Sequence, residues 1–160
     1  MKLKGIIDED FVNYKNICTC FIMPYCSFKC DKECGRPVCQ NSQLANAEII
    51  DISIDKLIDR YINNTISEAI VFQGLEPFDS YDELYAFIYK FTERCKDDIV
   101  IYTGYNEDEI VEEVETLVDI IESNKLIIKY GRFIPDDESV YDEILGVKLA
   151  SKNQYAKIVN

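Results

Sequence analysis

The chain has 160 residues, of which 17 are Lys or Arg and 30 are Asp or Glu, so its formal net charge is −13. This length, with 48% hydrophobic residues, predicts a single domain, residues 1–160, with enough apolar side chains for a core. An acidic chain repels the phosphate backbone, which argues against a nucleic-acid partner. Histidine is absent, which excludes Ser–His and Cys–His catalysis and removes the commonest general base.

The first residues, MKLKGIIDEDF, are charged and lack the apolar run of a signal peptide. No apolar run reaches the about 20 residues that cross a bilayer. We therefore expect a cytoplasmic protein with no membrane partner. Thiols stay reduced in that compartment, so the seven cysteines indicate metal binding or redox chemistry, not a disulfide scaffold.

Strand and helix patterns alternate along the chain. Short apolar runs predict strands at 2–7, 17–24, 69–73, 98–103, 126–131 and 144–150. Apolar residues at helical spacing predict helices at 53–64, 80–94 and 107–123. Ser53 is a candidate N-cap, Ser80 and Glu83 match a capping box, and Asn106 and Glu109 match it more loosely. The remaining tail from residue 132 is expected to be irregular.

This alternation, with strands that are continuously apolar, predicts an α/β fold with a mostly parallel sheet. A complete eight-fold β/α barrel needs about 250 residues. The chain is shorter, so we expect a partial, open β/α barrel in a single domain.

Three unusual loops follow predicted parallel strands. The cysteine loop, residues 25–41, follows strand 17–24, QGLEPF follows strand 69–73, and TGYNED follows strand 98–103. Parallel strands bring their carboxyl ends to one edge of the sheet, where ligands bind. We therefore expect the three loops to form one site.

The cysteine loop contains Cys26, Cys30, Cys34 and Cys39, with spacings of three, three and four residues. These spacings depart from the paired C-x₂-C turns of structural zinc sites and from the C-x₂-C-x₂-C-x₃-C-P cysteine pattern of bacterial ferredoxins. Structural zinc, an electron-transfer cluster and a metal-free thiol loop remain open, and a catalytic iron–sulfur site is favoured.

The other cysteines are expected to have different roles. Cys18 and Cys20 share one face of their strand, which predicts that they line the core or the sheet edge. Cys20 is close enough in sequence to the cysteine loop to be a spare thiol. Cys95 is expected to be a packing residue.

Together these motifs resemble the radical S-adenosylmethionine (SAM) enzymes. The resemblance rests on three features: a strand that runs into a Cys-x₃-Cys loop, the turn GLEP at 74–77, which is similar to that family's G-G-E-P turn, and YTGY at 102–105. Within the family the chain looks most like the small activating proteins of anaerobic ribonucleoside-triphosphate reductases. The tail residues Ser151, Asn153 and Gln154 match that subgroup's tail, so the resemblance covers nearly the whole chain.

The resemblance implies a [4Fe–4S] cluster held by three thiolates, with SAM bound to the fourth iron. It implies that Gly74, Leu75 and Glu76 receive the SAM ammonium and that Pro77 holds their turn. It also places Asn41, Tyr102, Thr103 and Gly104 at the cofactor. No catalytic side chain is expected beyond the cluster and SAM.

The identity of the third cluster ligand stays open, because the third cysteine of the family's usual Cys-x₃-Cys-x₂-Cys spacing would stand at the position of Glu33. Either Cys34 is the ligand, with one residue inserted, or Cys39 is. Cys39 is favoured because CQN at 39–41, preceded by the apolar Val38, resembles the family's motif end better. The residue after Cys39 is Gln40, not an aromatic residue.

The resemblance also implies partners: a large glycyl-radical enzyme, the anaerobic ribonucleotide reductase, and an electron donor such as flavodoxin. In this reading the protein cleaves SAM and generates a glycyl radical on the reductase. Two alternatives are a radical SAM enzyme acting on another protein or peptide, and a zinc-binding module without catalysis.

Overall fold

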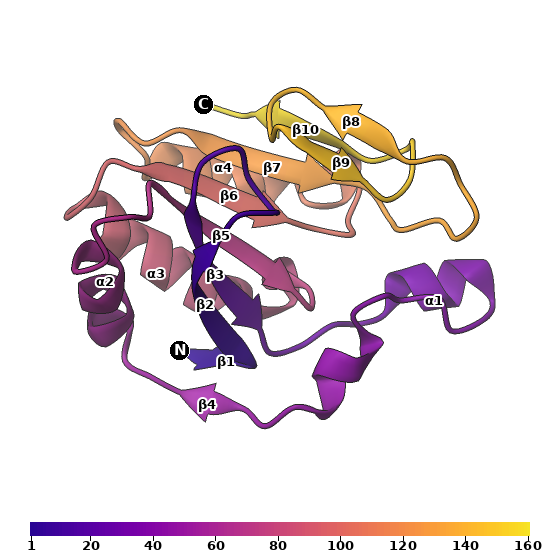
Figure 1. The fold of residues 1–160 in the computed structure, drawn as a ribbon, viewed down its shortest axis with the longest axis horizontal. Helices are drawn as coiled ribbons and strands as arrows, with labels where there is room; N and C mark the ends of the chain where they lie inside the picture. The colour runs from indigo at the N-terminus through magenta and orange to yellow at the C-terminus, as the bar shows by residue number, and fades with distance from the viewer.

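The computed structural model describes residues 1–160 and shows an α/β fold around one six-stranded sheet (Figure 1). Its strand order is β10–β7–β6–β5–β3–β2. These strands are β2 (Gly5–Asp10), β3 (Cys18–Met23), β5 (Ala69–Gly74), β6 (Asp98–Tyr102), β7 (Leu126–Tyr130) and β10 (Tyr155–Ile158). The four inner strands are parallel, and the edge strands β2 and β10 are antiparallel to their neighbours. The predicted α/β fold with an open, mostly parallel sheet is confirmed.

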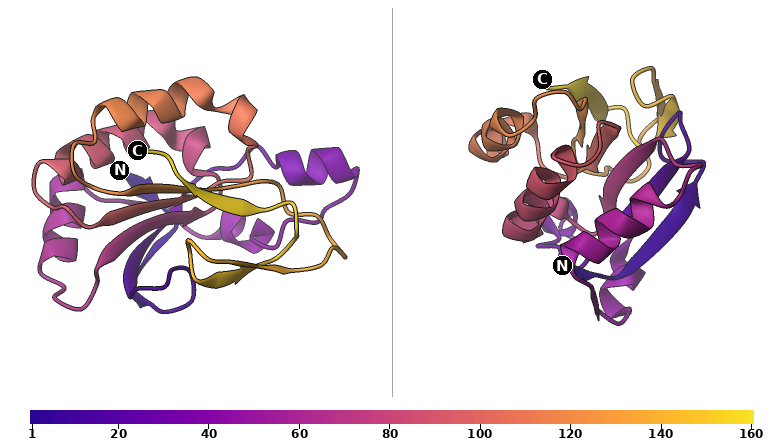
Figure 2. Two further views of the ribbon diagram at one scale, coloured as in Figure 1. Left: turned by 90° about the horizontal axis from the view of Figure 1, so that it is seen from above. Right: turned by 90° about the vertical axis from the view of Figure 1, so that its left-hand side faces the viewer.

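Three helices cover one face of this sheet (Figure 2): α2 (Ile54–Ile62), α3 (Tyr81–Thr92) and α4 (Val111–Asp119). Between them and the strands lies the larger core, in which Phe21, Phe72 and Phe87 pack with ring centroids 5.2–5.6 Å apart. None of the helices combines the length and the apolar content that a membrane crossing requires. The predicted packing role of Cys95 is confirmed, since it contacts this core.

The opposite face carries a smaller core. It is covered by the hairpin of β8 (Val140–Asp142) and β9 (Val147–Leu149) and by the segment that joins β2 to β3. Cys18 and Cys20 point into this smaller core, as the alternation of strand residues predicts. Helix α1 (Lys29–Cys34), which carries part of the cysteine loop, lies beyond the end of the sheet (Figure 1).

Several predicted elements differ in detail. The predicted strand at 2–7 is split into β1 (Lys2–Leu3), which pairs with β4 (Ile50–Asp51), and β2. The predicted strand at 144–150 is the turn and second strand of the β8–β9 hairpin, so the tail is more regular than expected.

The predicted helix at 107–123 is shorter than expected. It consists of a 3₁₀ turn, Glu107–Glu109, and α4, which ends at Asp119. The last turn of α4 has no basic residue, and the carboxylates of Asp119 and Glu122 are unfavourable at the negative end of a helix dipole.

The capping predictions have mixed outcomes. The looser box, Asn106 with Glu109, is present with both of its hydrogen bonds. The box predicted for Ser80 and Glu83 is wrong, because the Glu83 carboxylate accepts a hydrogen bond from the Lys2 backbone N–H instead. Ser53 precedes α2 in extended conformation, but its side chain makes no capping bond.

Candidate functional site

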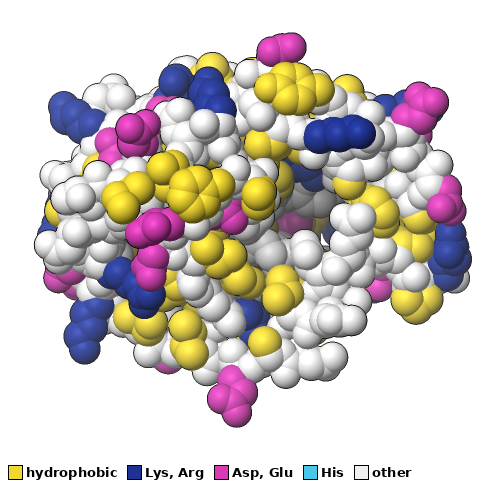
Figure 3. All heavy atoms as spheres, viewed as in Figure 1, with side chains coloured by type: hydrophobic (Ala, Val, Ile, Leu, Met, Phe, Trp, Pro, Cys, Tyr) yellow, Lys and Arg dark blue, Asp and Glu magenta, His cyan; other side chains and the backbone are white.

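The carboxyl ends of β3, β5, β6 and β7 open into one cavity of about 330 Å³. Figure 3 shows the hollow, with basic and acidic side chains at its floor. All three loops that were expected to meet there contribute to its wall: the cysteine loop, the turn at 74–76 and residues 102–104. Parallel pairing in register explains this convergence, because it brings these loops to the same edge of the sheet.

The four cysteines of the loop separate into two groups. Cys26, Cys30 and Cys39 lie on the cavity wall and are partly buried. Cys34 is exposed at the end of α1 and does not line the cavity. The structure therefore directs three thiols, not four, toward one space.

A backbone N–H acts on each of the three cavity thiols. Burial raises the pKa of Cys26 to about 12, although the Phe28 N–H, 3.2 Å from its Sγ, opposes the shift. Burial likewise raises the pKa of Cys30 and of Cys39, opposed by backbone hydrogen bonds from Phe133 and Asn41. Such N–H donors favour the thiolate form, which is the form that binds metal.

Glu76 is a buried carboxylate at the floor of the cavity, with 6% of its surface exposed. It accepts hydrogen bonds from the Thr103 hydroxyl at 2.7 Å, the Gly104 N–H at 2.8 Å and the Phe78 N–H at 3.2 Å. Burial raises the pKa of Glu76 to about 7, against these three donors. The carboxylate is held rigidly and is poised to ionise when a cation approaches.

Gly74 connects the turn to the cysteine loop. Its carbonyl accepts a hydrogen bond from the Asn41 side chain at 2.9 Å, and its φ of +94° lies in the region that favours glycine. A Cβ atom here would lie 2.5 Å from Cγ2 of Ile22, which leaves no room for a side chain.

We expect Gly74→Ala to lower the free energy of unfolding by about 3 kcal/mol or more, because backbone strain and overpacking add. Gly35→Ala is the matched control: Gly35 also has positive φ, at +67°, but nothing lies within 4 Å of the added Cβ. That variant should lose only about 1 kcal/mol. Anaerobic urea denaturation compares the two, and equal losses would contradict the role assigned to the Ile22 contact.

The remaining predicted cofactor residues have separate places. Leu75, Tyr102, Thr103 and Gly104 all line the cavity. A Cβ on Gly104 would lie 3.5 Å from both the Cys30 thiol and the Glu76 carboxylate, so these two groups converge there. Pro77 is buried at the start of the 3₁₀ turn Pro77–Ser80 and does not line the cavity, which limits it to shaping the turn.

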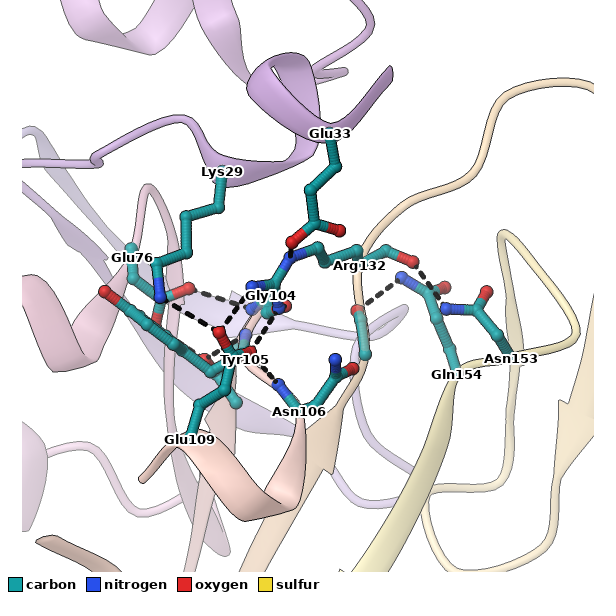
Figure 4. Close-up of polar contacts among 12 residues, drawn as sticks. Lys29, Glu33, Glu76, Gly104, Tyr105, Asn106, Glu109, Arg132, Asn153 and Gln154 are labelled. Carbon is teal, nitrogen blue, oxygen red and sulfur yellow. Dashed lines mark hydrogen bonds and ion pairs between the residues drawn. The ribbon is translucent and has the colours of Figure 1, made fainter. Parts of the chain in front are cut away.

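An ion-pair network joins α1 to the sheet edge (Figure 4). The Arg132 guanidinium lies 2.6 Å from Glu33 of α1, donates two hydrogen bonds of 2.6 Å to Glu109, and donates one of 2.7 Å to the Gly104 carbonyl. Lys29 of α1 also pairs with Glu109, at 3.0 Å. The Arg132 bond lowers the pKa of Glu109 to about 2, so this carboxylate is ionised at neutral pH.

We expect Arg132→Met to loosen α1, and with it Cys30. The Arg132 side chain is 7% exposed, but the carboxylates that its removal leaves unpaired, Glu33 and Glu109, are 59% and 25% exposed, so water screens them and the loss is about 1–3 kcal/mol. Iron bound by the cavity thiols should then pass to a chelator about ten-fold faster. Arg36→Met is the control, because Arg36 and Asp136 form an exposed pair at 3.6 Å and its loss should leave the rate unchanged. Equal rates in wild type and Arg132→Met would refute this anchoring role.

Lys129 is a site residue that the sequence analysis did not identify. It lines the cavity, is 7% exposed, and its ammonium reaches only the carbonyls of Gly131 at 3.1 Å and Thr103 at 3.4 Å. Burial lowers the pKa of Lys129 to about 8, against the attraction of Glu76 and Cys30. The signal was visible in LIIKYG, where one lysine interrupts a buried strand. It forms no ion pair within the chain, so it is available to an anionic group in the cavity.

The tail residues support the segment after β7. Gln154 lines the cavity and donates to the Gly131 carbonyl at 3.2 Å, while Asn153 donates to the Arg132 carbonyl at 2.9 Å. The buried Ser151 hydroxyl accepts a hydrogen bond from the Ile134 N–H at 3.2 Å. Of these three residues, only Gln154 reaches the cavity wall.

Comparison with known proteins gives one match. The model of a protein family described as 4Fe-4S single cluster domain matches residues 16–155. No curated protein and no solved structure matches the chain significantly.

Proposed function

We propose that this chain, which belongs to the 4Fe-4S single cluster domain family, is a radical SAM enzyme that activates a glycyl-radical protein. The family match makes it an iron–sulfur protein. One observation supports the finer proposal: a buried carboxylate, Glu76, and a buried ammonium, Lys129, line the same cavity as three cysteines. The amino-acid end of SAM carries one ammonium and one carboxylate, so its charges complement this pair.

The residues present fit a cluster with one open iron. In this proposal Cys26, Cys30 and Cys39 hold three irons, and Cys34 is not a ligand. The backbone N–H groups that act on the three sulfurs, and the nearby charges of Lys129 and Arg132, favour an anionic cluster. When bound, the cluster supplies the electron that cleaves SAM to methionine and a 5′-deoxyadenosyl radical, which takes hydrogen from the substrate.

The same thiols fit a structural zinc ion less well. Thiolates on a tetrahedral zinc ion lie about 3.8 Å apart. The ligand atoms of the cavity cysteines do not form a group of three within 4.8 Å of one another. The zinc-module alternative is therefore not favoured at this site.

The chain's own residues have separate tasks in this proposal. Glu76 accepts the SAM ammonium, and Lys129 pairs with its carboxylate. Gly74 and Leu75 let the backbone approach the ligand, and Asn41 fixes the end of the cysteine loop to that turn. Tyr102, Thr103 and Gly104 complete the wall. The partial β/α barrel expected from the strand–helix alternation and the chain length belongs to the same proposal, as does cytoplasmic localisation.

A protein substrate is supported by the cavity rim. Val12 lines the cavity and is 71% exposed, and the neighbouring Phe11 is 65% exposed. Large apolar side chains exposed at the mouth of a site indicate contact with another macromolecule. We propose that this partner is an anaerobic ribonucleotide reductase and that a flavodoxin-like protein donates the electron.

Electron paramagnetic resonance tests the activase proposal. The reconstituted protein, SAM, a reductant and the partner reductase should together give a glycyl-radical doublet, which should be absent when SAM is omitted. Cleavage of SAM without a radical on the reductase would instead favour the alternative, a radical SAM enzyme with another protein or peptide substrate.

A further inference from the structure

A second group of ligand-type side chains lies on the sheet face that the β8–β9 hairpin covers. It consists of Asp10, at the end of β2, and Cys18 and Cys20 of β3, whose ligand atoms all lie within 4.8 Å of one another. All three side chains are buried, and none lines the cavity. The expectation that Cys20 is a spare thiol of the cysteine loop is therefore wrong: strand alternation turns it away from that loop.

The two thiols already have the spacing of a metal-bound pair. Both extend from the same face of β3, and their Sγ atoms are 3.8 Å apart. Two thiolates on one tetrahedral zinc ion, each about 2.3 Å from it, lie about 3.8 Å from each other. Asp10 is paired with Cys18 in the antiparallel register, and its Oδ1 lies 3.9 Å from Cys18 Sγ.

The Asp10 carboxylate lacks a cation. It is 6% exposed, and its partners are N–H groups and the Cys18 thiol, none of which is a cation. Its Oδ1 accepts the backbone N–H groups of Val12 and Asn13, and its Oδ2 accepts the Asn13 side-chain amide, each at 2.9 Å. A carboxylate offers about four acceptor positions, so one on Oδ2 is still free. Buried charges in proteins are paired or bind metals, and here nothing in the chain supplies the positive charge.

We propose that Asp10, Cys18 and Cys20 form a second metal site, which takes a thiophilic divalent cation. Zn²⁺ fits this sulfur and oxygen ligand set best. Binding replaces two S–H bonds with two sulfur–metal bonds, and the two thiol protons pass to solvent. The inference does not depend on the function proposed for the cavity.

The site has a structural task. The Asp10 carboxylate holds Val12 and Asn13, and both of these residues line the cavity. The Asn13 carbonyl also accepts a hydrogen bond of 2.6 Å from the Tyr102 hydroxyl on the cavity wall. An ion bound to Asp10 therefore anchors one wall of the cavity without touching its contents.

The test uses a full-length chain in which Cys18 and Cys20 are the only cysteines, the other five being replaced by alanine. Titration with Co²⁺ should give one equivalent of bound ion with thiolate-to-metal charge-transfer absorption, and Zn²⁺ should displace it. The matched variant that also carries Cys18→Val and Cys20→Val keeps the core apolar and should show no such band. In the five-alanine chain that keeps Cys18 and Cys20, the further substitution Asp10→Asn should weaken Co²⁺ binding at least ten-fold.

Two results overturn the inference: a folded five-alanine chain, by circular dichroism, that binds no Co²⁺, or a charge-transfer band that survives Cys18→Val with Cys20→Val. If the five-alanine chain does not fold, the same titration is made on the triple variant Cys26→Ala, Cys30→Ala, Cys39→Ala, and the same two results overturn the inference there. Cys34 and Cys95 are in no group of three or more ligand atoms within 4.8 Å, and they lie on different elements, Cys34 at the end of α1 and Cys95 after α3.

Discussion

Cys39→Ala is expected to abolish cluster assembly, while Cys34→Ala leaves it nearly intact. Cys39 lies on the cavity wall with Cys26 and Cys30, and Cys34 is exposed outside it. All the thiolates that hold a [4Fe–4S] cluster must reach the same cluster. A thiolate that faces solvent outside the cavity does not reach a cluster inside it. After anaerobic reconstitution, Cys34→Ala should contain about four irons per chain and Cys39→Ala well below one.

Two further variants make this comparison stricter. Cys26→Ala should lose iron as completely as Cys39→Ala, and Cys95→Ala, which removes a packing thiol, should retain it. Circular dichroism checks that each variant is folded. Loss of iron in Cys34→Ala with retention in Cys39→Ala would reverse the ligand assignment, and retention in both would contradict it.

Glu76→Gln is expected to weaken SAM binding about 100-fold while the protein keeps its iron. The carboxylate is the only acidic side chain on the cavity wall. Charge-assisted hydrogen bonds are worth about twice as much as neutral ones, and burial increases the difference. A glutamine also replaces one carboxylate oxygen with an N–H₂ group, which then faces either the Gly104 N–H or the pair of donors Phe78 N–H and Thr103 hydroxyl without accepting from them. Isothermal titration of the reconstituted protein with SAM measures the loss.

The pH dependence gives this prediction a second readout. Because burial raises the pKa of Glu76 to about 7, the protonated form predominates at pH 6 and the ionised form at pH 8. The SAM ammonium binds the ionised form, so wild-type affinity should rise from pH 6 to pH 8. The Glu76→Gln profile should lack this rise and keep only the smaller fall that loss of the Lys129 charge causes near pH 8, since burial lowers the pKa of Lys129 to about 8. The control Glu107→Gln alters an exposed carboxylate outside the cavity and should bind SAM like wild type. An identical pH profile in Glu76→Gln and wild type would exclude Glu76 as the group that titrates.

Much of the fold was predictable because its strands and helices have clear periodicities. β3, β5, β6 and β7 are short apolar runs, and their parallel pairing follows from the helices between them. The errors fall where tertiary contacts decide: Glu83 binds the Lys2 backbone instead of capping α3, and the two short strands of the β8–β9 hairpin have little pattern of their own.

The site was predictable in part for a topological reason. Loops that follow parallel strands meet at one edge, so the cysteine loop, the turn after β5 and residues 102–104 were expected together. Lys129 and Arg132 were missed because the importance of a charge within or after a buried strand depends on what faces it. The spacing of the cysteines likewise left Cys34 and Cys39 open, since only the path of α1 turns one outward and the other inward.

We propose above all that the cavity holds a cluster that cleaves SAM. The most direct measurement determines iron content and 5′-deoxyadenosine in one sample: the anaerobically reconstituted protein with SAM and dithionite, beside the variant Cys26→Ala, Cys30→Ala, Cys39→Ala. We predict about four irons per chain and 5′-deoxyadenosine formation in the wild type, and neither in the variant. A wild-type protein that binds about four irons and leaves SAM intact, or that binds zinc in place of iron at the cavity thiols, would contradict the claim.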